Sequence, residues 1–339
     1  MPARSQGDPV ATIRDQFFKE EFNKVLATYS QLPSDEREIP LVCFFAGQSY
    51  FRNHDIEHAD ELLNKAVSGT LPAPQRERAE AALSKLKTLK ELRPPMYHDY
   101  TLEGYTIRIF AKDTPWAKSI AAQMPTFLAR AKEGFGNANA YIAFYLFEDR
   151  QSYDRFFGAW ESSNPEVTVH RGTGGRHIVM FCRYFPEGTE IGGKDVNDLY
   201  CRILHEYSHA LCNTVYGDNF KMPPLFNEGM ADYFGWKYKP QGAEIASKRL
   251  QAIAAKRAAM PYAVILKSFH DDNYYGYTIA DVLINDLLHK QPLSVYGRII
   301  DLARSSNSNF EYALQQVSGL EPRSEYNRIV GAYWKSGIK

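Results

Sequence analysis

The stretch His205-Glu206-Tyr207-Ser208-His209 is the most informative part of this 339-residue chain. Its two histidines are four positions apart, so on a helix they lie on one face, where both imidazoles can hold one metal ion. Glu206 would point to the side of that face, toward a water molecule on the metal. The pattern predicts a helical metal site. It also requires a third ligand, because a short pattern of this kind can arise by chance.

Glu228 is the candidate for that third ligand. It follows His209 by nineteen positions, after a turn-forming stretch that contains a Gly-Asp pair and a Pro-Pro pair. Two histidines and one glutamate leave the fourth tetrahedral position to water, whereas a structural zinc site is closed by four ligands, usually including cysteine. The four cysteines are scattered and form no CxxC pair. The ligand set is therefore typical of a catalytic zinc site.

Asp232 lies one helical turn beyond Glu228, so the two carboxylates are expected on the same helix face. A carboxylate in that place can accept the spare ring N–H of a ligating histidine and so fix its tautomer.

These residues resemble the gluzincin metallopeptidases, and more narrowly the peptidase MA-like group. The likeness rests on the His205–His209 motif and on the run LFNEGMADYF at residues 225–234, and it covers roughly residues 96–339. It implies an α+β fold, with a thermolysin-like zincin domain made of a small mixed sheet, active-site helices and a helical C-terminal subdomain.

The resemblance also implies the site chemistry. One Zn²⁺ per chain would be held by His205, His209 and Glu228, and Asp232 would support His205. Glu206 would take a proton from the metal-bound water as that water attacks a polarised carbonyl.

A further donor is needed for the oxyanion that forms in such a reaction. In the resembling families a tyrosine or histidine downstream of the third ligand supplies it. Tyr275 is the favoured candidate here, and Tyr274, Tyr277 and His270 remain open.

Composition limits the partners. Forty Lys and Arg residues balance forty Asp and Glu residues. No basic cluster or RNA motif is present, so nucleic acid is not an expected partner. No apolar stretch reaches the roughly eighteen residues of a membrane helix, and no membrane span is expected. Residues 1–8 lack the apolar segment of a signal peptide, which leaves the compartment open between the cytoplasm and export with removal of a leader.

The first ninety or so residues have apolar positions at helical spacing. Residues 41–51 and 59–67 resemble one tetratricopeptide repeat, with Gly47, Tyr50 and Ala59 near the expected places. Helices at 10–31 and 74–92 would have to complete the core of this unit. We expect a helical N-terminal domain over residues 1–95, acting as a cap or as a surface for a protein partner.

Arg93-Pro94-Pro95 marks the predicted boundary with a metallopeptidase domain over 96–339. That domain divides into a part with the sheet and the HExxH helix, 96–216, and a helical part, 217–339. The expected strands or hairpin lie at 100–110, 141–147 and 177–184, and the expected helices at 116–135, 153–160, 198–215, 243–257, 277–288 and 294–303.

The strand just before the HExxH helix has a role in the resembling peptidases, where it is the edge along which extended substrate pairs its backbone. By that resemblance the substrate edge strand would be His177, Ile178, Val179, Met180 and Phe181. Gly172, Gly174 and Gly175, just before it, predict a turn or rim rather than a phosphate loop.

The predicted function is a zinc-dependent metallopeptidase acting on a peptide or protein substrate. Related aminopeptidases carry a Gly-x-Met-Glu-Asn run before the motif, and its absence here favours an endopeptidase. Two alternatives stay open. One is a catalytically weak or inactive zinc-binding protein that recruits partners through its helical region, and the other is a zinc hydrolase of a non-peptide amide or glycoprotein.

Overall fold

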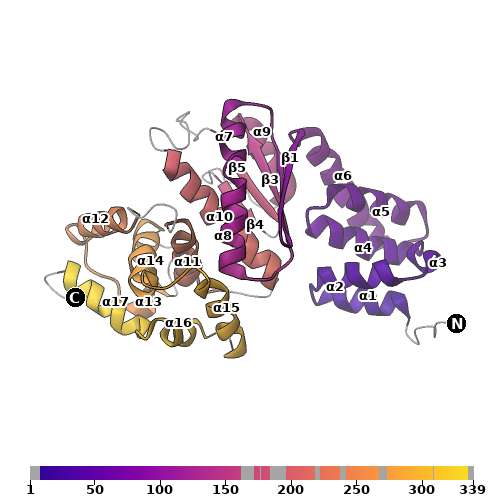
Figure 1. Cartoon of the computed structure of the whole chain (residues 1–339). Coiled ribbons are helices and arrows are strands. Elements are labelled where there is room, and N and C mark those ends of the chain that lie inside the picture. The colour runs from indigo at the N-terminus through magenta and orange to yellow at the C-terminus, as the bar shows by residue number, and fades with distance from the viewer. Residues whose placement is uncertain are drawn as a thin grey trace.

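A computed structural model describes residues 8–161, 172–175, 177–183, 196–217, 222–236, 242–266, 273–307 and 309–334. The chain is mostly helical and contains a small mixed sheet, which makes it an α+β protein, as predicted. In Figure 1 the sheet lies between the indigo N-terminal helices and the orange to yellow C-terminal helices.

The N-terminal region is helical, as expected. Its elements are α1 (Pro9–Phe18), α2 (Phe22–Gln31), α3 (Ser34–Arg37), α4 (Pro40–Arg52), α5 (Ile56–Ser68) and α6 (Ala73–Leu92). The helix expected over 10–31 is two helices, because Glu20 adopts a positive φ of 57° that ends α1. Helices α4 and α5 pack closely at Gly47, where a Cβ atom would lie 2.9 Å from Leu63 Cγ.

The sheet has the strand order β1-β2-β3-β5-β4. Strands β1 (Met96–Leu102) and β2 (Tyr105–Phe110) form an antiparallel hairpin, and β2 pairs in parallel with β3 (Ala140–Phe147). Strand β5 (Ile178–Cys182) pairs in parallel with β3 and antiparallel with β4 (Gly172–Gly175).

This order corrects the predicted substrate edge strand. Ile178, Val179, Met180 and Phe181 lie in β5, which has a neighbour on both sides, so their backbone has no open edge. His177 lies in a turn at a φ of 61°, and its backbone N–H donates to Thr214 Oγ1 at 2.9 Å. The outer strand on this side of the described sheet is β4, and the glycines expected in a turn are therefore in a strand.

The sheet is buried on both faces. Along β3, residues 142, 144 and 146 belong to one apolar core, while residues 143, 145 and 147 belong to a second. This is the alternation of a pleated strand, in which neighbouring side chains point to opposite faces. It also explains why the sequence of β3 reads as a continuous apolar run.

Different helices cover the two faces. One core takes in α7 (Pro115–Ala121), α8 (Met124–Phe135) and α10 (Val196–Tyr216), and the other takes in α9 (Arg150–Glu161) and the N-terminal helices (Figure 1). The helix expected over 116–135 is two helices, because Pro125 lies in the first turn of α8 and lacks the N–H that a continuous helix would need.

The C-terminal part is helical. It comprises α11 (Pro224–Trp236), α12 (Gly242–Ala254), α13 (Tyr262–Ile265), α14 (Asn273–Leu288), α15 (Val295–Ser305), α16 (Phe310–Ser318) and α17 (Pro322–Tyr333). Within the described ranges, no helix combines the length and hydropathy that crossing a membrane requires.

The second core continues across the boundary predicted at residues 93–95. Leu86 and Leu89 of α6 belong to the same buried cluster as Tyr145 of β3 and Phe156 of α9. The N-terminal helices are therefore packed against the sheet rather than separated from it, and the division into two domains remains a prediction.

Candidate metal centre

Helices α10 and α11 bring the predicted ligands together. The apolar positions of α10, among them Ile203, Leu204 and Tyr207, are buried in the core, and this fixes the direction in which the histidine face points. Pro224 stands at the start of α11, where its fixed φ favours a first helical turn. His205 and His209 come from α10, and Glu228 comes from α11.

The three ligand groups converge on one point. His205 Nε2 lies 3.1 Å from His209 Nε2 and 3.1 Å from Glu228 Oε2. His209 Nε2 lies 3.5 Å from the same carboxylate oxygen. Ligands at 2.0–2.1 Å from a tetrahedral zinc ion are about 3.3 Å apart, so this spacing fits a single ion. Among the described residues, these three form the cluster able to hold a metal ion.

Asp232 lies where it was predicted, next to His205. Its Oδ1 atom accepts a hydrogen bond of 2.7 Å from His205 Nδ1. With its proton on Nδ1, the imidazole turns the lone pair of Nε2 toward the other two ligands. This is the tautomer that a metal ion requires.

In the metal-free state, the neighbouring charges and hydrogen bonds shift the pKa values of the candidate ligands. Burial opposes the charged form of His205, but the neighbouring Asp232 carboxylate outweighs it and raises the pKa of His205 well above its usual value. Burial likewise opposes ionisation of Glu228, yet its hydrogen bonds to His205 and His209 lower the pKa of Glu228. The Glu228 carboxylate is thus kept ionised, whereas in the metal-free state His205 holds a proton that a metal ion would have to displace.

Glu206 is half-buried on α10, next in sequence to the ligand His205. Its negative charge contributes to a raised pKa of Tyr277 on α14, behind the larger effects of burial and of Glu228. Tyr277 therefore lies close enough to Glu206 and Glu228 for their charges to raise its pKa.

Tyr275, the predicted donor to the oxyanion, has other hydrogen-bond partners in this structure. Its side chain is fully buried, and its hydroxyl lies 2.9 Å from the hydroxyl of Tyr326 and accepts from the backbone N–H of Met260 at 3.3 Å. Tyr277, two positions later on α14, points to a different side of the helix. After burial, the charge of Glu228 is the next largest cause of its raised pKa. Of the other candidates, His270 lies outside the described residues, and the side chain of Tyr274 is not described.

Asp281 of α14 is a site residue that the sequence analysis missed. Its side chain is 5% exposed and is hydrogen-bonded to Asp232. Burial and the neighbouring carboxylate raise the pKa of Asp281, so it is a neutral acid that donates to Asp232. The sequence does offer one signal for this residue. Asp281 follows Tyr277, a candidate site residue, by one helical turn, so both lie on the same face of the helix.

Gly229 explains how Asp281 comes so close. A Cβ atom at this position of α11 would lie 2.4 Å from Ile284 Cγ1 and 2.8 Å from the carbonyl oxygen of Ala280. Only glycine permits this approach of the two helices, which brings the carboxyl group of α14 against Asp232.

Comparison with known proteins adds no relative: no protein-family model matches this chain, and no curated protein is significantly similar to it.

Proposed function

We propose that this protein is a zinc-dependent hydrolase of peptide bonds, acting as an endopeptidase. The observation that carries the proposal is the convergence of three atoms that lie 3.1 to 3.5 Å apart. Two are imidazole nitrogens of α10, the helix that also carries Glu206, and the third is the Glu228 carboxylate oxygen of α11. A set of three protein ligands is typical of catalytic rather than structural zinc sites.

When bound, zinc would polarise the scissile carbonyl and acidify a water molecule. Glu206 would take the proton of the attacking water and pass it to the leaving nitrogen. Asp232 would hold His205 in its ligating tautomer, and Asp281 would hold Asp232 by donating a hydrogen bond to it. The Tyr277 hydroxyl would donate to the oxygen that gains negative charge.

Strand β4 is the place where we expect an extended substrate to pair. It is the outer strand on its side of the described sheet and packs against α10, the helix of the metal ligands. Backbone pairing at a sheet edge tolerates many side chains, which suits a peptide substrate.

The deciding experiment compares the wild-type protein with Glu206→Gln. We expect both to bind one zinc ion per chain by elemental analysis, and only the wild type to cleave a peptide library read out by mass spectrometry. A His209→Ala variant, which removes a ligand, should lose both zinc and cleavage.

A protein that retains zinc but cleaves no peptide in either form would contradict the peptidase proposal. That result would leave a zinc-binding protein that acts by recruiting partners or one that hydrolyses a different amide.

A further inference from the structure

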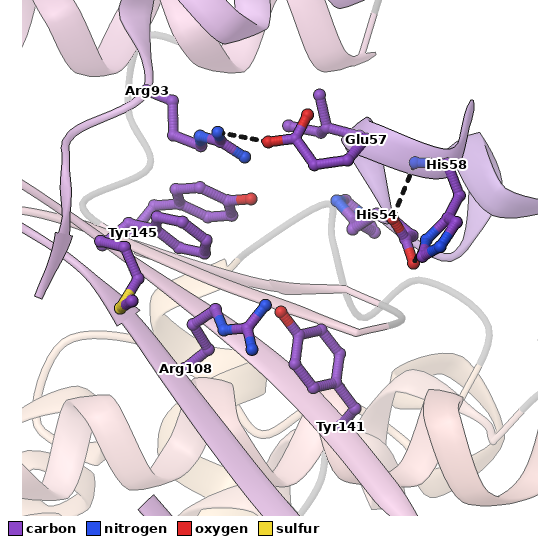
Figure 2. A pocket seen from close by; sticks show the side chains of 11 residues that line it. His54, Glu57, His58, Arg93, Arg108, Tyr141 and Tyr145 are labelled. Atoms are coloured by element: carbon purple, nitrogen blue, oxygen red, sulfur yellow. Dashed lines mark hydrogen bonds and ion pairs between the residues drawn. The ribbon is translucent and has the colours of Figure 1, made fainter. Parts of the chain in front are cut away.

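A cavity of about 440 Å³ lies where the N-terminal helices meet the sheet (Figure 2). Three segments line it: the turn and first residues of α5, the connection from α6 to β1, and the face of β2 and β3 turned away from α10. The lining residues are His54, Asp55, Ile56, Glu57, His58, Arg93, Met96, Arg108, Phe110, Tyr141 and Tyr145. A volume of this size accommodates a small ligand or the end of a peptide.

The cavity has a flat aromatic wall. The rings of Phe110 and Tyr145 stack with centroids 4.8 Å apart and an interplanar angle of 9°. Both side chains are buried, so their position is fixed by the core behind them. A rigid wall of this kind favours a ligand with an apolar or aromatic body.

Arg93 forms one polar wall. Its Nη2 donates to Glu57 at 2.6 Å, and its guanidinium carbon lies 5.0 Å from the centroid of the Phe110 ring. A guanidinium has five N–H groups, and the bond to Glu57 uses one of them. Arg93 is therefore held in place with donors to spare.

Arg108 lies on another wall, apart from Arg93 and beside Tyr141 (Figure 2). Its Nε and Nη2 atoms each donate to the Asp99 carboxylate at 2.8 Å. The guanidinium carbon of Arg108 lies 5.5 Å from the centroid of the Tyr141 ring. This bidentate ion pair orients the guanidinium and leaves Nη1 outside the pair. Two arginines that are already oriented bind an anion at a smaller entropic cost than mobile side chains would.

The charge of the anion is limited by the acids in the same lining. Asp55 and Glu57 also border the cavity, and they would repel a doubly charged phosphate more than a singly charged carboxylate. A carboxylate also matches the planar geometry of a guanidinium.

We propose that this cavity is a binding site for a carboxylate carried on an aromatic or apolar body, with Arg93 and Arg108 receiving the carboxylate and Phe110 and Tyr145 the body. The source is either a free aromatic acid or the C-terminal residue of a peptide. The site is separate from the metal centre, since it lies across the sheet from α10.

Calorimetric titration of the whole chain with N-acetylphenylalanine, and with a blocked tetrapeptide ending in phenylalanine, tests this site. We expect both free acids to bind and their C-terminal amides not to bind. Chelator-treated protein should bind equally well, which excludes a carboxylate that binds zinc instead. The relative affinities of the short acid and the peptide distinguish the two sources.

Variants make the test specific. Arg93→Gln and Arg108→Gln should each weaken binding roughly tenfold or more, because each removes a charged hydrogen bond. Glu57→Gln should strengthen binding, because the amide oxygen can still accept from Arg93 while a negative charge beside the ligand is lost. Arg78→Gln, at an exposed position of α6, is the matched control and should bind as the wild type does. Equal binding of acid and amide, no binding to the wild type, or loss of binding in the Arg78 variant would overturn the proposal.

Discussion

At the scale of single residues, the two carboxyl groups of Asp232 and Asp281 share one hydrogen bond, which requires a proton on one of them. Asp281 carries that proton, and its Oδ1 has no hydrogen-bond partner among the described residues, as expected of an acid that donates through its other oxygen. Its role is then to orient Asp232 and, through it, His205.

We therefore expect Asp281→Asn to keep the zinc affinity within a few-fold of the wild type, because an amide still donates to Asp232. Asp281→Leu removes the donor and should weaken zinc binding by about 10- to 100-fold. Competition with a fluorescent zinc chelator measures both values. Equal losses in the two variants would mean that the charge of Asp281, rather than its donated hydrogen bond, matters.

The two tyrosines of α14 should respond differently to loss of the hydroxyl. Tyr277→Phe should lower kcat by about 10²- to 10³-fold with little change in KM, if its hydroxyl stabilises the oxyanion. Tyr275→Phe removes the hydrogen bonds to Tyr326 and Met260. It should reduce the free energy of unfolding by about 1–3 kcal/mol and leave kcat unchanged.

Steady-state kinetics and thermal unfolding of the two variants separate these effects. A Tyr275 variant that is stable but inactive, beside an active Tyr277 variant, would reverse the assignment.

At the scale of elements, the contact between α11 and α14 depends on Gly229. Gly229→Ala would force the helices apart, because the added methyl group meets Ile284 and the backbone of Ala280. We expect a loss of about 1–3 kcal/mol in the free energy of unfolding, with weaker zinc binding as Asp281 moves from Asp232.

Gly158→Ala in α9 is the matched control. A Cβ atom there would meet nothing within 4 Å, so this change should leave zinc binding intact and stabilise the fold by about 0.4–1 kcal/mol. Chemical unfolding with and without zinc measures both variants. If Gly229→Ala behaved like the control, close helix contact would not be what holds the site.

Local patterns explain which elements could be predicted. The spacing within α10 and α11 places His205, His209, Glu228 and Asp232 on facing helix surfaces, and these residues do come together in the structure. Strand order is different, because it is set by pairing between distant segments. A strand rich in glycine, such as β4, has no propensity signal, so the sequence predicts β5 as the edge. The sequence also does not show which tyrosine of α14 lies nearest the metal ligands, because the rotation of α14 is set by its packing against α11 and α17.

At the scale of the whole molecule, zinc binding should couple to folding and pH. Although burial opposes it, Asp232 raises the folded-state pKa of His205 above the reference value of 6.5. Protonated His205 therefore stabilises the metal-free fold below about pH 6.5, and this contribution is lost as the pH rises through the raised pKa. Zinc needs the unprotonated ring, so protons compete with it at low pH.

The increase in melting temperature on adding excess zinc should thus be larger at pH 8 than at pH 6. Thermal unfolding of chelator-treated protein at both values, with and without zinc, checks this. Asp232→Asn should reduce the pH dependence of the metal-free protein. An increase that is the same at both pH values would contradict the coupling.

The predicted boundary at residues 93–95 shows what composition alone misses. The Pro-Pro pair does end the helical region, since β1 begins at Met96. However, the buried residues of α6 continue into the sheet core through Tyr145 and Phe156. Which faces of two segments meet is decided by packing between them, and a break in local structure carries no information about it.

The alternation along β3 has a practical consequence for experiment. Phe144 packs against Tyr207 of the metal-site helix, while its neighbour Tyr145 stacks on Phe110 in the carboxylate cavity. Neighbouring residues of this strand thus contact opposite faces of the sheet. A library that varies only the even or only the odd positions of this strand would tune one site while leaving the chemistry of the other untouched.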